Sequence, residues 1–282
     1  MHRMEDAVVP KISEFVNDVV NNFVDYDECF VLKNAVSTGY KGLDRKLGGF
    51  KRGGLYLLGG VPEIGTTAMA VSIIYKTAIK EGHRVLYYTT QTSASEITER
   101  LLRRMARISY VKEETGPEDD AEIKEAADQL KEADIYVSDV KGKSLSEILE
   151  DEYTSNGNKA FDLIVVDHLE GVYDTVLSKE GLYSFKILAK EYNCPILVIT
   201  KLDCIDNPRG NNLRPVLENF RTLALSDYVD TYMVLFRGDF FGEKGMKGIA
   251  ELYILKSNDC IPDVVEMIFL EEFRVFVDCE TL

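Results

Sequence analysis

The sequence predicts an α/β fold, in which a mostly parallel, twisted sheet carries helices on both faces and antiparallel strands along a C-terminal edge. Two observations predict it. Apolar strand patterns alternate with helical patterns between Leu55 and Thr200, and the last third of the chain is rich in strand patterns. Alternating strands and helices are typical of parallel sheets covered on both faces, whereas consecutive strands favour antiparallel pairing.

The elements follow in order along the chain. Residues 6–24 place apolar side chains at helical spacing, which predicts an amphipathic helix that packs on its own domain or on a neighbouring subunit. This helix and a connection occupy residues 1–33, and one domain covers 34–282. The predicted strands are Leu55–Gly60, Arg84–Thr90, Ile135–Ser138, Phe161–Asp167, Pro195–Thr200, Thr231–Arg237, Ile249–Lys256, Asp263–Phe269 and Arg274–Asp278. The predicted helices are Thr67–Glu81, Ala94–Arg107, an acidic stretch before Ile135, Leu145–Tyr153 and Ser178–Tyr192.

Composition limits the classes of protein to consider. The chain has 282 residues, of which 45% are hydrophobic, so one large domain can bury a substantial core. It contains no apolar run of about 18 residues and no secretory signal, so no membrane contact is expected. Five scattered cysteines favour the reduced cytoplasm over a disulfide framework or a zinc site. The formal net charge of −15 opposes long-range attraction to nucleic acid.

The stretch GGVPEIGTTA, which follows the first strand of the alternation, nearly matches a phosphate-binding loop. In the pattern G-x-x-x-x-G-K-[ST], Gly60, Gly65 and Thr67 are in place, but Thr66 occupies the lysine position. The stretch is therefore either a nucleotide site that lost its cation or a turn that never held a phosphate. A later apolar strand, FDLIVVD, ends in Asp167, which matches the carboxylate that holds Mg²⁺ in phosphate-loop enzymes.

Several segments occur in a telling order: STGYKGLDRKLGGFKRGGLYLLGGVPEIGTTAMA, YTTQTSASEITERLLRR, FDLIVVDHLEGV, LAKEYNCPILVIT, LRPVLENFR and IAELYILKSNDCIPDVVEMIFLEEFRVFVD. Together they resemble the C-terminal ATPase domain of DnaB-type replicative DNA helicases, over roughly Ser37 to Asp278. The resemblance implies a RecA-like P-loop NTPase core that acts in DNA replication. It also implies that residues 8–24 form a linker helix that docks on the adjacent subunit of a ring, and that the family's N-terminal primase-contacting domain is absent.

The resemblance also assigns site residues. Those implied to contact nucleotide are Gly60, Pro62, Gly65, Thr66, Thr67 and Lys256, and those implied to contact Mg²⁺ are Thr67 and Asp167. Four catalytic positions depart from the family's motifs. Thr66 replaces the loop lysine, Gln91 the glutamate that activates water, Lys201 the glutamine that senses the γ-phosphate, and Asn258 the arginine finger.

These departures weigh against turnover. Losing the lysine removes a charge-assisted contact of about 1.5–3 kcal/mol, and Glu63 adds a carboxylate to the loop. Losing the general base costs about 10²–10⁴ in rate and losing the arginine finger about 10³–10⁵. The leading hypothesis is a binding or assembly component without ATP hydrolysis. The alternatives are an active ATP-dependent helicase whose lysine has moved to Lys201, and a site adapted to another anion; the cofactor stays open between none and weakly bound Mg²⁺ with ATP or ADP.

Lys201 is expected to compensate for the vacant lysine position. Without a phosphate and its metal, the carboxylates of Asp167 and Glu63 would repel one another across the site. Lys201 lies at the end of a neighbouring predicted strand, so its ammonium is predicted to approach one of these carboxylates to within roughly 4 Å.

Contacts to single-stranded DNA are a weaker hypothesis. Candidate cations stand in two polar stretches, Ile205–Pro215 and Phe236–Lys247, the second of which also offers Phe240 and Phe241 for base stacking. These cations are Arg209, Arg214, Arg237, Lys244 and Lys247. Ordinary surface loops remain the alternative for both stretches, and His168 is interpreted as a wall residue beside Asp167. The partner stays open between self-association and a mixed ring through residues 8–24.

Overall fold

The computed structural model describes residues 12, 33–89, 91–112, 116, 119–139, 144–155, 159–167, 179–202, 214–215 and 227–279. Of the helix predicted over 8–24, only Ile12 belongs to these ranges, so that helix and the boundary at residue 33 stay predictions. Within the described ranges, no helix combines the length and apolar character needed to cross a bilayer.

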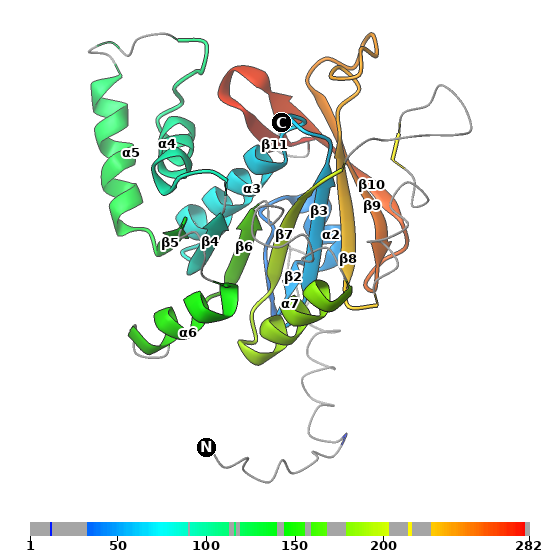
Figure 1. Cartoon of the computed structure of the whole chain (residues 1–282). Coiled ribbons are helices and arrows are strands. Elements are labelled where there is room, and N and C mark those ends of the chain that lie inside the picture. The colour runs from blue at the N-terminus through cyan, green and yellow to red at the C-terminus, as the bar shows by residue number, and fades with distance from the viewer. Residues whose placement is uncertain are drawn as a thin grey trace.

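A nine-stranded sheet in the order β11-β10-β9-β8-β3-β7-β6-β4-β5 forms the centre of the fold (Figure 1). The strands are β3 (Leu55–Gly60), β4 (Val85–Thr89), β5 (Ile135–Ser138), β6 (Leu163–Asp167), β7 (Ile196–Lys201), β8 (Thr231–Phe236), β9 (Ile249–Ser257), β10 (Asp263–Leu270) and β11 (Val275–Asp278). The strands from β8 to β5 are parallel, and β9, β10 and β11 continue the sheet antiparallel. The predicted mixed sheet is therefore confirmed. A separate two-stranded ladder joins β1 (Ala35–Val36) to β2 (Phe50–Lys51).

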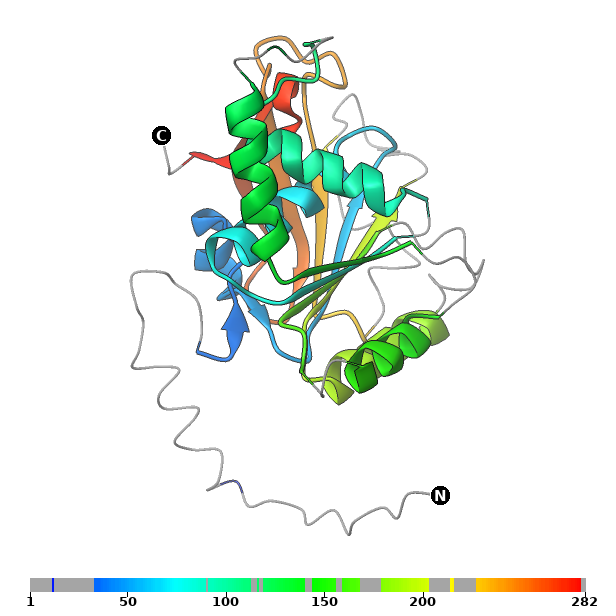
Figure 2. The ribbon, with the colours of Figure 1, turned by 90° about the vertical axis from the view of Figure 1, so that its left-hand side faces the viewer.

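Helices cover both faces of this sheet. They are α2 (Lys41–Leu47), α3 (Thr66–Ile74) with its π-helical extension Tyr75–Lys80, α4 (Ala94–Met105), α5 (Asp120–Glu132), α6 (Leu145–Ser155) and α7 (Lys179–Glu191), with a 3₁₀ turn at Glu271–Phe273. Figure 2 places α4 and α5 on one side of the sheet and α6 and α7 on the other.

The alternation of side chains along the parallel strands explains the two layers. In β3, Tyr56 and Leu58 pack with α2, α3 and α4, whereas Leu55 and Leu57 pack with α6 and α7. Successive side chains of a strand point to opposite faces, so a strand covered on both sides must be apolar throughout. All five residues of β6 are buried, and even its last residue, Asp167, is fully buried. The continuous apolar runs that predicted parallel strands therefore reflect two cores separated by one sheet.

The connection that precedes α2 depends on a buried carboxylate. Asp44 is 3% exposed and accepts hydrogen bonds from the backbone N–H of Thr38 at 2.8 Å and from the hydroxyl of Ser37 at 2.9 Å. Burial outweighs these hydrogen bonds and raises the pKa of Asp44 to about 6. The folded chain consequently holds this proton more tightly than the unfolded chain does.

This shift predicts a pH dependence of stability. Because the folded-state pKa lies above the unfolded value, the stabilisation is complete below about pH 4 and is lost as pH rises through about 6, by about 3 kcal/mol in all. Urea unfolding between pH 5 and 7 should show a smaller fall in the free energy of unfolding for Asp44→Asn than for the unmodified chain. Asp128→Asn, on the exposed face of α5, is the control, and an equal fall in the Asp44→Asn variant would contradict the assignment.

Candidate nucleotide site

The parallel register gathers the predicted site residues at one edge of the sheet. β3 ends at Gly60, which lies beside Lys201 at the end of β7. β6 ends at Asp167, which lies beside Thr89 at the end of β4. Because the carboxyl ends of parallel strands meet at the same edge, residues far apart in the sequence border one site.

The loop between β3 and α3 has the strained backbone that a tight phosphate-type turn requires. Glu63 has φ of 68° and Gly65 has φ of 113°, both in the left-handed region. Gly65 is the N-cap of α3, and its carbonyl accepts the N–H of Met69 at 2.9 Å. Ile64 is fully buried, so the loop closes over an apolar side chain.

Thr66, at the lysine position, belongs to the packed interior of this turn. Its side chain is 7% exposed. A Cβ atom added to Gly60 would lie 2.7 Å from the Thr66 methyl carbon and 2.6 Å from Cγ2 of Ile64, so only glycine fits at the end of β3. Thr66 therefore supplies packing at a position where a phosphate loop needs a long cationic side chain.

The two residues on the expected metal side lie together. The Thr67 hydroxyl lies 3.4 Å from Oδ1 of Asp167, and the Tyr87 hydroxyl donates a short hydrogen bond to Oδ2 of the same carboxylate. Burial and the adjacent carboxylate raise the pKa of Tyr87 well above its usual value, so the hydroxyl keeps the proton that it donates. One hydroxyl and one carboxylate fit Mg²⁺ in part, but Tyr87 already uses one of the two carboxylate oxygens.

Lys201 pairs with a neutral side chain. Its ammonium donates to Oε1 of Gln91 at 2.9 Å, and the described residues contain no ion pair between Lys201 and either Asp167 or Glu63. The prediction that the Lys201 ammonium approaches Asp167 or Glu63 was therefore wrong. Asp167 is held by hydroxyl groups, and the ammonium at the end of β7 reaches across β6 to the segment that follows β4.

Lys256 and Asn258 lie at the opposite end of the sheet from the loop. Lys256 pairs with Tyr232 near the start of β8, because β9 runs antiparallel to β8. Asn258 donates to Asp230 at 3.1 Å, and the N–H of Asp230 bonds to the carbonyl of Leu55, the first residue of β3. The length of β3, about 17 Å at roughly 3.3 Å per residue, separates this end from the loop, so one chain does not bring the two groups together.

The chain is similar to several known proteins. A model of the DnaB-like helicase C-terminal domain matches residues 35–278. The chain belongs to this family. It is 27% identical over 274 residues to the replicative DNA helicase DnaB of Geobacillus stearothermophilus, covering 90% of this chain and 60% of that protein. It is 25% identical over 258 residues to the replicative DNA helicase DnaC of Bacillus subtilis, covering 87% of this chain and 57% of that protein.

Two solved structures are similar to this fold. One of them, an ATPase domain, superposes with a TM-score of 0.83 at 21% identity, covering 96% of this chain and 99% of that domain. A DnaB-like replicative helicase studied with primase superposes with a TM-score of 0.80 at 21% identity, covering 96% of this chain and 67% of that one. The predicted RecA-like fold is thereby confirmed. The DnaB-like chain spans about three fifths of the curated relatives that it matches.

The cations predicted to contact DNA differ in availability. Arg214 already pairs with Glu243 at 2.9 Å and Glu251 at 3.3 Å. Arg237 is 7% exposed, bonds to Asp239 and stacks over Phe269. Lys244 and Lys247 are exposed. Arg209 and His168 lie outside the described residues.

The two phenylalanines of this stretch also differ. Phe241 stacks on Phe236 with ring centroids 5.1 Å apart, so its face is already used within the chain. Phe240 is 42% exposed and touches Phe241 edge-on. Among the described residues of this stretch, two lysines and one aromatic ring therefore remain available to contact nucleic acid.

Tyr87 is the site residue that sequence reasoning missed. The pattern of RVLYYTT predicts only a strand, although its two adjacent tyrosines must face opposite sides. Tyr87 packs in the core beneath α3, and Tyr88 in the core beneath α6 and α7. The sequence signal for this contact was a tyrosine within an apolar strand, because the hydroxyl group of a buried tyrosine requires a hydrogen-bond partner.

A double-mutant cycle can test the Tyr87–Asp167 contact. In the DnaB-like domain, Tyr87→Phe should lower the free energy of unfolding by about 1.5–3 kcal/mol, because a buried carboxylate loses a donor. In an Asp167→Asn background, the same replacement should cost less than about 1 kcal/mol, since an amide oxygen is a weaker acceptor. Urea unfolding measures both values. Equal costs in the two backgrounds would show that the tyrosine contributes packing alone.

Proposed function

We propose that this DnaB-like domain no longer hydrolyses ATP and serves as a binding or assembly component in DNA replication. Membership of the family and similarity to replicative helicases support the link to replication. The scattered cysteines favour the cytoplasm as the site of action.

One observation carries the loss of hydrolysis. At the position where a phosphate loop holds lysine, Thr66 is packed beneath the turn against Gly60. A threonine hydroxyl cannot supply the charge that balances β- and γ-phosphates. The exposed Glu63 in the same turn adds a carboxylate on the side from which phosphates would approach. A triphosphate would therefore meet backbone N–H groups but no loop cation.

The Lys201–Gln91 contact supports the same proposal. Gln91 stands at the family's general-base position, yet an amide cannot accept a proton from water. Its oxygen is also occupied by the ammonium of Lys201. Two departures from the family's catalytic set thus complement each other through a hydrogen bond from an ammonium group to an amide oxygen.

The alternative is an ATPase whose lysine has moved. Lys201 favours it, because the ammonium belongs to the strand end beside Gly60 and is only partly buried. Exchanging Gln91 for a phosphate oxygen would replace a neutral acceptor with an anionic one, so that both partners of the hydrogen bond would be charged. ATP binding that weakens in Lys201→Gln but not in Lys112→Gln would promote this alternative.

Assembly is supported by the separation of Lys256 and Asn258 from the loop. Groups about 17 Å from their own loop could serve a nucleotide only on another chain, as in a ring. With Asn258 bonded to Asp230, this chain offers no guanidinium there. A ring with a second, catalytically complete protein and a ring of identical chains both fit.

We expect no ATP hydrolysis above background, with or without single-stranded DNA. Thr66→Lys should strengthen binding of a fluorescent ATP analogue by about 10- to 100-fold, as expected for a contact of about 1.5–3 kcal/mol. Thr98→Lys, on the exposed face of α4, controls for net charge. Phosphate release by the unmodified chain that saturates with ATP and disappears in Asp167→Asn would refute the loss of hydrolysis.

Self-association should depend on the apolar stripe of residues 8–24. Light scattering after size exclusion is expected to give a smaller mass for Phe15→Ser or Phe23→Ser than for the unmodified chain, because each change removes an apolar side chain from the predicted contact. Asn17→Ser, at a polar position of the same helical pattern, should not change the mass. If the unmodified chain is a monomer at all concentrations, the mixed ring is the alternative that remains.

A further inference from the structure

A bridge of two side chains crosses the end of β6, the strand that carries Asp167. β6 lies between β7 and β4 in the sheet (Figure 1). In the strand register, Asp167 lies beside Ile199 of β7 and beside Thr89 of β4. Lys201 and Gln91 each stand two residues farther along the chain, and the Lys201 ammonium donates to Oε1 of Gln91 at 2.9 Å. The two side chains are therefore joined just beyond the end of β6.

This bridge belongs to the face of the sheet that α3 covers. Val165 of β6 and Ile199 of β7 pack in the core beneath α3. Residues two positions apart on a strand point to the same face, so Asp167 and Lys201 continue that face towards the strand ends. The hydroxyl of Thr67, in the first turn of α3, lies 3.4 Å from Oδ1 of Asp167. The bridge consequently borders the space between α3 and the strand ends, where phosphates and a metal would lie.

The residues around Asp167 do not fit a Mg²⁺ ion. Magnesium requires near-octahedral oxygen ligands and usually keeps several water molecules. Asp167 is fully buried, and its two carboxylate oxygens accept hydrogen bonds from the hydroxyls of Thr67 and Tyr87. A metal would have to displace a hydroxyl from a closed site. It would also have to approach from the side that the Lys201 ammonium crosses, where like charges repel.

The bridge is open to solvent, so its ammonium can exchange one acceptor for another. Gln91 is exposed and Lys201 is only partly buried. The present acceptor is a neutral amide oxygen. A phosphate oxygen is anionic, and hydrogen bonds between two charged partners are the stronger kind. A polyphosphate that reaches the loop would therefore displace Gln91 from the ammonium.

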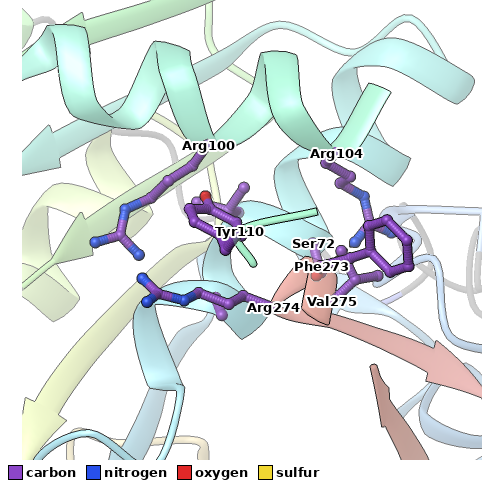
Figure 3. Close-up of a pocket in the computed structure, with 9 residues that line it drawn as sticks. Ser72, Arg100, Arg104, Tyr110, Phe273, Arg274 and Val275 are labelled. Carbon is purple, nitrogen blue, oxygen red and sulfur yellow. Dashed lines mark hydrogen bonds between the residues drawn. The ribbon is translucent and has the colours of Figure 1, made fainter. Parts of the chain in front are cut away.

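A second group of cations near α3 offers no comparable site. Arg100, Arg104 and Arg274 line a narrow space between α3, α4 and the turn that precedes β11 (Figure 3). Its volume of about 10 Å³ has room for about one water molecule. Arg104 extends towards Ser72, to which it donates at 2.9 Å, and away from the other two arginines. This group therefore provides a control rather than a candidate.

We propose that the Lys201 ammonium takes the place of Mg²⁺ at the candidate nucleotide site, which therefore binds the phosphates of a nucleoside diphosphate or triphosphate without a metal. The loop between β3 and α3 supplies backbone N–H groups, as phosphate loops do, and Lys201 supplies the positive charge. This inference deepens the proposed function and rests on it, because hydrolysis by phosphate-loop enzymes depends on the metal.

Titration of the full chain with a fluorescent ADP analogue, in EDTA and then in excess MgCl₂ at equal ionic strength, tests the inference. Saturable binding is expected in EDTA and should weaken in MgCl₂, because the free metal competes with Lys201 for the phosphate oxygens. Lys201→Gln should lower the affinity in EDTA about tenfold or more, since it removes a charge-assisted contact. Arg274→Gln, an exposed position of the second group, is the control and should bind as the unmodified chain does.

Gln91→Glu provides a second variant of nearly the same shape. It turns the bridge into an exposed ion pair, which holds the ammonium away from a phosphate. Binding in EDTA should weaken by up to about fivefold, as the strength of an exposed ion pair implies. Thermal unfolding checks that this variant and Lys201→Gln are folded, and neither should unfold at a clearly lower temperature, because both positions lie at the surface end of the sheet.

The remaining outcomes separate this inference from the loss of hydrolysis. Binding that appears or strengthens in MgCl₂ would show a metal-dependent site and overturn the inference. If the unmodified chain also released phosphate from ATP, the proposed function would fail with it, in favour of the ATPase with a relocated lysine. An absence of saturable binding in EDTA, or equal binding by Lys201→Gln, would overturn the inference alone and leave the loss of hydrolysis in place.

Discussion

The burial of the inner parallel strands on both faces is the constraint on which the rest of the structure depends. It forces continuous apolar sequence through β3, β6 and β7, and leaves only their ends for polar chemistry. Gly60, Asp167 and Lys201 stand at those ends. The same strand register that forms the two cores therefore also assembles the candidate nucleotide site. No short stretch of the sequence indicates that these residues lie together.

At this edge, two charged side chains are in contact with neutral side chains. A phosphate loop balances a polyphosphate and a metal with a lysine and a carboxylate. Here the carboxylate of Asp167 is held by Tyr87 and Thr67, while the ammonium of Lys201 bonds to Gln91. In both contacts, protein side chains stabilise the charge, so neither contact needs a bound ligand. The fold of a nucleotide-binding domain can thus be stable without a nucleotide.

Sequence alone predicted the fold and the loop but not the partners of the site residues. Alternating patterns and the loop spacing are local, so β3, α3 and the end of β6 could be predicted to within a few residues. The Tyr87–Asp167 contact depends on which face of β4 meets α3, and this is set by pairing with β6. The prediction of an ion pair for Lys201 was based on charge alone, whereas the direction of this side chain at the end of β7 decides its partner.

At the far end of the sheet, an ion pair and hydrogen bonds converge on Asp230. Asp230 accepts hydrogen bonds from the backbone of Leu55 and from Asn258, and pairs with Lys186 of α7. These contacts tie the starts of β3 and β8 to the end of β9 and to the helix layer. An arginine at position 258 would have to leave this cluster in order to reach a neighbouring chain, whereas asparagine is short enough to remain bonded to it. Asn258 therefore forms part of the contacts that hold its own domain together.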